Sequence, residues 1–134
     1  MQETYAALLQ KLTPAEKIHL ILFPEQAPSI RHAVDVALFE SQRRFRGGAR
    51  NTASDAFRHC FWSALVSRDI GYGSALRYTK AHEDFPDNPP AEKAMDLHNN
   101  AVGLNIGRFG GEDQIVASRC MAALTSGKLK IIES

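Results

Sequence analysis

The chain has 134 residues, of which 44% are apolar and 23% are charged, a composition that supports one domain with a hydrophobic core. Sixteen Lys and Arg residues stand against fifteen Asp and Glu residues, so the net charge is +1. Bulk charge therefore gives no support to nucleic-acid binding, although it does not exclude it.

Neither a membrane span nor a disulfide framework is predicted. The longest apolar stretch, residues 18–23, contains His19 and is stopped by Pro24. The N-terminus has no basic region followed by an apolar run, so no classical signal peptide is expected. Cys60 and Cys120 lie in apolar helical patterns and are predicted to be buried free thiols.

Helix-start signals and periodicity predict four helices in the first half of the chain. A short amphipathic helix is expected over residues 3–12. The next is capped by Thr13, with Pro14 at its first position and Glu16 completing a capping box, and it stops at Pro24. Ser29 is expected to cap the third helix, and a strongly apolar fourth helix is expected over residues 52–70.

Three further helices are predicted in the second half, over residues 75–84, 90–108 and 112–126. Ser74 precedes the first of them, and the proline-rich segment 85–90 forms a loop that cannot continue it. The tail, residues 128–132, is predicted to be a short strand or a frayed end. The fold class expected is therefore all-α, a compact single-domain bundle of about six to seven short helices.

One basic spot ends the third helix. It consists of Arg43, Arg44, Arg46 and Arg50. A solvated helix end favoured by the helix dipole is the preferred interpretation, ahead of a phosphate site.

The segment from Asp55 to Trp62 carries the first candidate site. One side of the predicted helix is apolar, while Asp55 and His59, four residues apart, share the opposite side with Trp62. This pattern predicts a central helix whose polar stripe faces a partly closed pocket. The alternative is a buried Asp–His pair that only satisfies itself. His19 and His32 are interpreted as structural or surface residues.

The helix over residues 90–108 carries the second candidate group. His98 and Asn99 share a face with apolar residues and are expected to face the pocket. Asp96 and Asn100 share another face with Gly103 and Gly107, whose spacing allows close approach of a second backbone. On an ideal helix Asp96 and His98 lie about 160° apart, which argues against both binding one ion. Asp96 and Asn100 are expected to hold neighbouring helix ends or the proline loop.

His82 and Glu83, at the end of the helix over residues 75–84, form the third group; a histidine merely favoured by the helix dipole is the alternative. The chain contains no His-Glu-x-x-His motif, Gly-rich phosphate loop, Gly-x-Ser-x-Gly elbow or paired zinc cysteines. Metalloproteases, P-loop enzymes, serine hydrolases and zinc fingers are therefore disfavoured.

These three segments resemble a family of uncharacterised helical toxin domains at the C-termini of bacterial polymorphic toxins and secretion-system effectors, including wall-associated-protein-type toxin tips. The resemblance covers residues 52–108. The matching positions are Asp55, Phe57, Arg58, His59 and Trp62; Ala81, His82 and Glu83; and Met95, Asp96, His98, Asn99, Asn100 and Gly103. It implies an all-α antibacterial effector that a cognate immunity protein neutralises.

The function expected from these residues is hydrolysis of a phosphate-containing substrate, a nucleic acid such as tRNA being favoured. His59 would be the general base or a metal ligand, oriented by Asp55, and Arg58 would bind phosphate or anchor a loop. The remaining catalytic candidates are His82, Glu83, His98 and Asn99, with Trp62, Asp96, Asn100 and Gly103 in support. A divalent metal, Zn²⁺, Mn²⁺ or Mg²⁺, is compatible with His59, His82, Glu83 and His98 as ligands.

Two alternatives remain at this level. An envelope hydrolase would act on phospholipid, a lipid-linked precursor or peptidoglycan, with Glu83 and Asp96 as paired carboxylates. A non-enzymatic helical binding module would use the same residues as a buried polar network. As an effector the protein is expected to be delivered without a classical signal peptide and to act in the target cell, in the cytoplasm rather than the periplasm.

Overall fold

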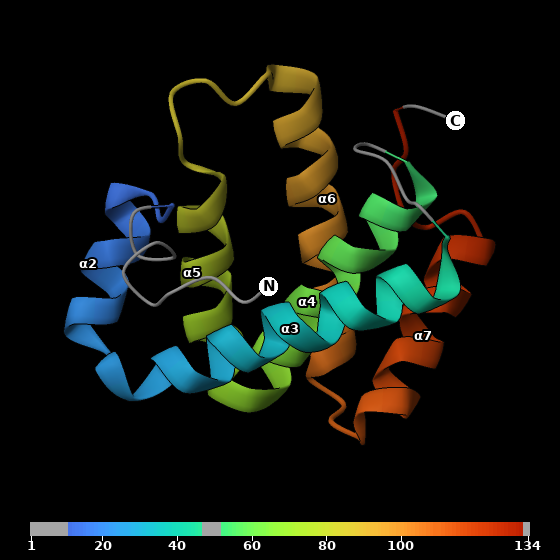
Figure 1. The fold of residues 1–134 in the computed structure, drawn as a ribbon, viewed down its shortest axis with the longest axis horizontal. Helices are drawn as coiled ribbons and strands as arrows, with labels where there is room; N and C mark the ends of the chain where they lie inside the picture. The colour runs from blue at the N-terminus through green and yellow to red at the C-terminus, as the bar shows by residue number, and fades with distance from the viewer. Residues whose placement is uncertain (1–10, 47–51, 133–134) are drawn as a thin grey trace.

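The computed structural model describes residues 11–46 and 52–132 (Figure 1). These residues form six α-helices and one short 3₁₀ helix, and none of them is in a strand. The elements are α2 (Pro14–Leu22), η1 (Pro24–Gln26), α3 (Ala27–Arg44), α4 (Ala53–Ile70), α5 (Tyr72–Glu83), α6 (Pro90–Gly107) and α7 (Asp113–Thr125). The all-α prediction is confirmed. The helix expected over residues 3–12 lies outside the described residues, apart from residues 11–12, which are not helical.

The capping box predicted at the start of α2 is confirmed. Thr13 and Glu16 form the predicted capping box at the start of α2, with hydrogen bonds of 3.0 and 2.9 Å. Thr52 is the N-cap of α4, and Glu112 is the N-cap of α7. Since each cap residue holds an extended backbone, the helix begins at the next residue.

Two local predictions are wrong, and one of two alternatives is removed for the tail. Ser29 is not an N-cap, because η1 leads directly into α3 and Ala27 already has helical dihedrals. Ser74 lies inside α5, which begins right after Gly71, whose positive φ of 92° turns the chain out of α4. Of the two alternatives for the tail, the short strand is not formed, because the carbonyls of Lys128 and Lys130 and the amide of Lys130 bond to side chains of α6.

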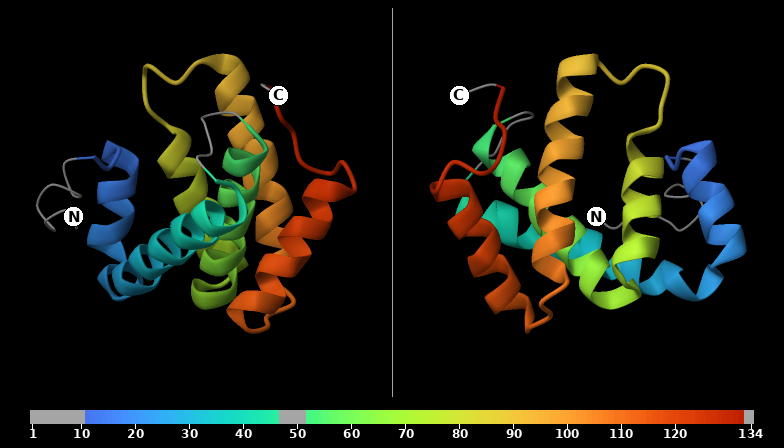
Figure 2. Two further views of the ribbon diagram at one scale, coloured as in Figure 1. Left: turned by 45° about the vertical axis from the view of Figure 1, so that its right-hand side comes forward. Right: turned by 180° about the vertical axis from the view of Figure 1, so that it is seen from behind.

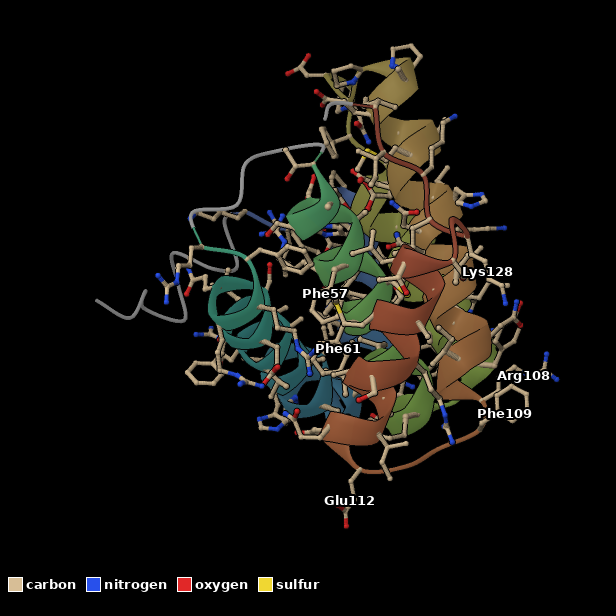
Figure 3. All side chains as sticks on the ribbon, turned by 90° about the vertical axis from the view of Figure 1, so that its right-hand side faces the viewer. Phe57, Phe61, Arg108, Phe109, Glu112 and Lys128 are labelled. Carbon is tan, nitrogen blue, oxygen red and sulfur yellow. The ribbon has the colours of Figure 1, made fainter. Side chains whose placement is uncertain are left out.

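α4 is the central helix, as its two-sided pattern predicts. It packs against α3, α5, α6 and α7, and twelve of its eighteen residues are buried. Phe57 and Phe61 point from α4 into the interior, whereas Arg108 and Phe109 project outward at the end of α6 (Figure 3). The buried side of α4 also holds Cys60, a free thiol like the buried Cys120 of α7.

The contact between α4 and α6 depends on two glycines one helical turn apart, as predicted. A methyl group on Gly103 would collide with the carbonyl oxygen of Cys60, and one on Gly107 with that of Ala64. The two backbones therefore approach more closely than larger residues would allow. Ser67 uses this proximity to donate a 2.8 Å hydrogen bond to the carbonyl of Leu104.

The remaining helices are arranged around this pair. α5 and α6 run antiparallel and are joined by the loop 84–89, while α2 and α7 lie at opposite ends of the molecule (Figures 1 and 2). Within the described residues, no helix is both long and apolar enough to cross a bilayer. α4, α5 and α6 together bring the three polar sequence segments to one region.

Candidate active site

The centre of the site is the imidazole of His59 on α4. Its Nε2 lies 3.3 Å from Oδ1 of Asp55, one turn earlier on the same helix, and 3.5 Å from Oδ1 of Asp96 on α6. The three side chains are 13%, 6% and 14% exposed, so this contact is withdrawn from solvent. Asp96 was predicted to hold neighbouring helix ends or the proline loop, and it was given a catalytic role only in the envelope-hydrolase alternative.

The other ring nitrogen of His59 faces α5. Its Nδ1 lies 4.0 Å from Oε2 of Glu83, whose side chain is 2% exposed. Glu83 accepts a 3.3 Å hydrogen bond from the amide of Asn100, and the amide oxygen of Asn100 accepts one of 3.0 Å from Ser63. α4, α5 and α6 thus each contribute to a polar chain that positions Glu83 beside His59.

Burial and like charge change the acidity of the cluster. Desolvation of Asp96, reinforced by the negative charges of Glu83 and Asp55, raises the pKa of its carboxyl to about 6, although His59 and His82 act in the opposite direction. The carboxylates therefore crowd one another around a single imidazole.

Three buried polar atoms in this region have no hydrogen-bond partner. They are Nδ1 of His59, Oδ1 of Asp96 and Nε1 of Trp62. Buried polar groups are normally paired, since an unmade hydrogen bond costs about 1 to 3 kcal/mol. Unpartnered atoms on both His59 and Asp96 indicate that the cluster is arranged for something other than satisfying itself. This disfavours the interpretation of a self-satisfied Asp–His pair.

Arg58 links the cluster to the surface. Its Nη2 donates a 2.7 Å hydrogen bond to Oδ1 of Asp55, and its side chain is 44% exposed. Together with His59 it lines a cavity of about 370 Å³. Most of the wall is apolar and comes from α2, α3 and the residues before them: Leu12, Leu20, Ile30, Val34, Ala37 and Leu38.

His82 belongs to a separate group on the other side of the cavity. Its Nδ1 lies 3.2 Å from Oε2 of the buried Glu16, which also accepts a 2.7 Å bond from Tyr78. Burial works against the charged imidazole, but the hydrogen bond and charge of Glu16 raise the pKa of His82. The ring of Trp62 lies between the two groups, 5.0 Å from that of His82.

Glu16 is the residue that sequence reasoning missed at this place. Its position in the capping box explains the contact of one carboxylate oxygen, Oε1, which accepts a hydrogen bond from the backbone N–H of Thr13. Nothing in the sequence indicates that the other oxygen would meet α5, because that contact depends on how α2 packs.

The expected orientation of α6 is wrong. Asp96 and Asn100 face His59 and Glu83, whereas His98 and Asn99 face the C-terminal tail. His98 is exposed and its Nε2 lies 2.8 Å from the carbonyl oxygen of Lys128 (the tail position labelled in Figure 3). The buried Asn99 pairs with the backbone of Lys130 through two hydrogen bonds. Neither side chain reaches the cluster.

Of the four metal ligands suggested by the sequence, only His59 and Glu83 lie together, 4.0 Å apart. His82 is held by Glu16, and His98 lies on the tail side of α6. Among the described residues, the group able to offer three ligand atoms to one ion is Asp55, His59 and Asp96.

The basic spot at the end of α3 is largely neutralised. Arg43 and Arg44 both bond to the buried Glu40, which also accepts from Gln114. Burial opposes its ionised form, but these bonds lower the pKa of Glu40 to about 2. Arg46 is exposed, and Arg50 lies outside the described residues. Two of the four arginines are thus engaged within the fold, which favours the interpretation as a helix end.

The chain belongs to the family described as a domain of unknown function (DUF6973), whose model matches residues 17–128. No solved structure matches the chain. The matched range contains every residue of the His59 cluster and extends well beyond the motif region, residues 52–108. Glu16 lies just before it.

Proposed function

We propose that this domain is a hydrolase that acts on a phosphate-containing substrate, as the toxic part of a bacterial effector. The observation that carries the proposal is the buried cluster of Asp55, His59, Glu83 and Asp96, which has unpartnered atoms on His59 and Asp96 and reaches the cavity wall through His59. Perturbed carboxyl acidity beside a cavity is typical of catalytic sites.

The reaction assigned to the cluster is the addition of water to phosphorus. A proton leaves the water as its oxygen bonds to phosphorus, the bond from phosphorus to the leaving oxygen breaks, and that oxygen takes up a proton. His59 is the group at which water is activated, with Asp55 and Asp96 on one side of its ring and Glu83 on the other. Arg58 donates one N–H to Asp55, and the other N–H groups of its guanidinium can bind phosphate oxygens.

The apolar lining of the cavity favours one class of phosphate-containing substrate. Its apolar side chains suit a hydrocarbon portion next to the phosphate, such as that of a phospholipid or a lipid-linked precursor. Arg43 and Arg44, two of the four cations in the basic spot that could have contacted nucleic-acid phosphates, bond to Glu40. We therefore favour a lipid-type phosphate ester over tRNA, and keep nucleic acid as the second candidate.

The test is growth arrest on induced expression, with the chain kept in the cytoplasm or sent to the periplasm by an added signal sequence. His59→Ala is the inactive variant, and His32→Ala, which removes an exposed histidine of α3, is the matched control. Circular dichroism of the purified variants checks that both are folded.

Arrest from the periplasm that His59→Ala abolishes and His32→Ala retains is the expected result. Arrest from the cytoplasm alone, with the same dependence on His59, would replace the lipid substrate with an intracellular one. If both routes leave growth unchanged with expression verified, or if the folded His59→Ala variant is as toxic as the wild type, the hydrolase proposal is wrong.

A further inference from the structure

The oxygens of Asp55 and Asp96 and one nitrogen of His59 converge on one point between α4 and α6. Nε2 of His59 lies 3.3 and 3.5 Å from the two carboxylate oxygens, and all three atoms lie within 4.8 Å of one another. Two atoms bound to one cation at bond lengths of about 2.1 Å lie about 3.0 to 3.5 Å apart in octahedral or tetrahedral geometry. The spacing in the cluster matches that of ligands around an ion.

The hydrogen bonding of the cluster independently points to a missing ligand. Oδ1 of Asp96 is buried and has no hydrogen-bond partner, even though Nε2 of His59 is 3.5 Å away. Two lone pairs that face each other without a proton in line are costly unless a cation lies between them. Asp55 Oδ1 accepts a hydrogen bond from Arg58, and an ionised carboxylate offers about four lone-pair sites in all.

The charge of the region points in the same direction. Three buried carboxylates, those of Asp55, Glu83 and Asp96, surround His59. Among the described residues, the permanently charged cation in direct contact with these carboxylates is Arg58, which pairs with Asp55. His82 forms an ion pair with Glu16 instead. Within the described part of the chain, the carboxylates in this group outnumber the permanent cations in contact with it, which suits a divalent cation.

The other ring nitrogen of His59 has a carboxylate as its neighbour, 4.0 Å away and without a hydrogen bond between them. Metal-ligating imidazoles direct their second N–H at a carboxylate, which fixes the tautomer and orients the ring. The carboxylate near Nδ1 of His59 is that of Glu83, which accepts a hydrogen bond from Asn100, and Asn100 in turn accepts one from Ser63. The chain thus contains both a set of ligands and a residue that would orient the histidine among them.

We propose that Asp55, His59 and Asp96 bind a divalent cation, with Glu83 positioning His59. One imidazole with two carboxylates suits Zn²⁺ or Mn²⁺ better than Ca²⁺, which takes oxygen ligands. The inference deepens the proposed function: the cation lowers the pKa of a bound water, and the remaining coordination positions take that water and the phosphate.

The experiment is calorimetric titration of the chelator-treated, purified chain with Zn²⁺, Mn²⁺ and Mg²⁺ separately. Wild type is expected to bind one Zn²⁺ or Mn²⁺ per chain, and binding is expected to raise its melting temperature. Asp96→Asn, which keeps the shape of the side chain, and His59→Gln are expected to lose this binding. Glu83→Gln should weaken it roughly tenfold or more, and His32→Ala should leave it unchanged.

Absence of binding by folded wild type for all three ions would overturn the site. So would equal affinity in wild type and Asp96→Asn, because the ion would then lie elsewhere. The result separates the two proposals: toxicity that depends on His59 without ion binding leaves the hydrolase with His59 as general base. Ion binding without toxicity from either compartment leaves the site and removes the proposed function.

Discussion

At the residue scale, buried charges are stabilised very unequally in this molecule. Glu40 and Glu16 each accept several hydrogen bonds from cationic or polar partners, and the pKa of both is lowered. Asp96 is also mostly buried, yet its nearest groups include two further carboxylates and its pKa is raised. Structural carboxylates and candidate catalytic carboxylates therefore differ in how completely they are paired.

Because of Glu40, the free energy of unfolding is expected to decrease at acidic pH. Because its pKa falls from 4.5 to about 2 on folding, its contribution is complete above pH 4.5 and is lost as the pH falls toward 2. Glu40→Gln should lower the free energy of unfolding at pH 7 by about 2 to 3 kcal/mol, and the difference from wild type should shrink toward pH 2. Urea unfolding at several pH values measures this, with the exposed Glu25→Gln as control; a difference that does not vary with pH would contradict it.

At the element scale, buried polar contacts join α2 to α5. Tyr78 donates to Oε2 of Glu16, and Thr13 donates to the carbonyl of Ala81. Tyr78→Phe removes only a hydroxyl and should cost about 1 to 2 kcal/mol, since Glu16 is buried and loses a donor. Tyr72→Phe, at a half-exposed position, should be close to neutral in the same urea titration. Equal effects of the two variants would mean that α2 is held by its apolar contacts alone.

The contact between α4 and α6 depends on the missing side chain at Gly103. Gly103→Ala should destabilise the fold by about 2 kcal/mol or more, because the new methyl group meets the backbone of Cys60, which cannot move without moving α4. Gly73→Ala on α5 is the matched control: its methyl group would meet nothing closer than 3.8 Å and should be neutral or stabilise by about 0.5 kcal/mol. Thermal melts decide the question, and tolerance of Ala at position 103 would show that α6 is free to shift.

The elements were predictable where the signal is local. Thr13 with Glu16, the glycine pair on α6 and the two-sided α4 follow from capping chemistry and helical periodicity. The rotation of α6 was not predictable, because both of its polar faces are partly buried and only packing determines which meets α4. His98 and Asn99 were therefore assigned to the site, whereas Asp96 and Asn100 are the residues of α6 that contact His59 and Glu83.

At the scale of the whole molecule, the C-terminal tail is attached to α6 by side chains rather than by strand pairing. Asn99 accepts from the Lys130 amide at 2.8 Å and donates to its carbonyl at 2.9 Å. Asn99→Ala should cost about 1 to 3 kcal/mol and increase hydrogen exchange in the tail, yet leave growth arrest in place. Loss of growth arrest in a folded Asn99→Ala variant would contradict this assignment and would mean that Asn99 takes part in the function.

The central claim is that the His59 cluster exists for function and is maintained at a cost in stability. Its most direct test is the free energy of unfolding of Asp96→Asn against wild type at neutral pH, both treated with chelator. Removing one of three crowded, buried carboxylates while keeping the side chain's shape should raise the free energy of unfolding by about 1 to 2 kcal/mol. A variant less stable than wild type would contradict the claim, because the cluster would then be a polar network that stabilises the fold.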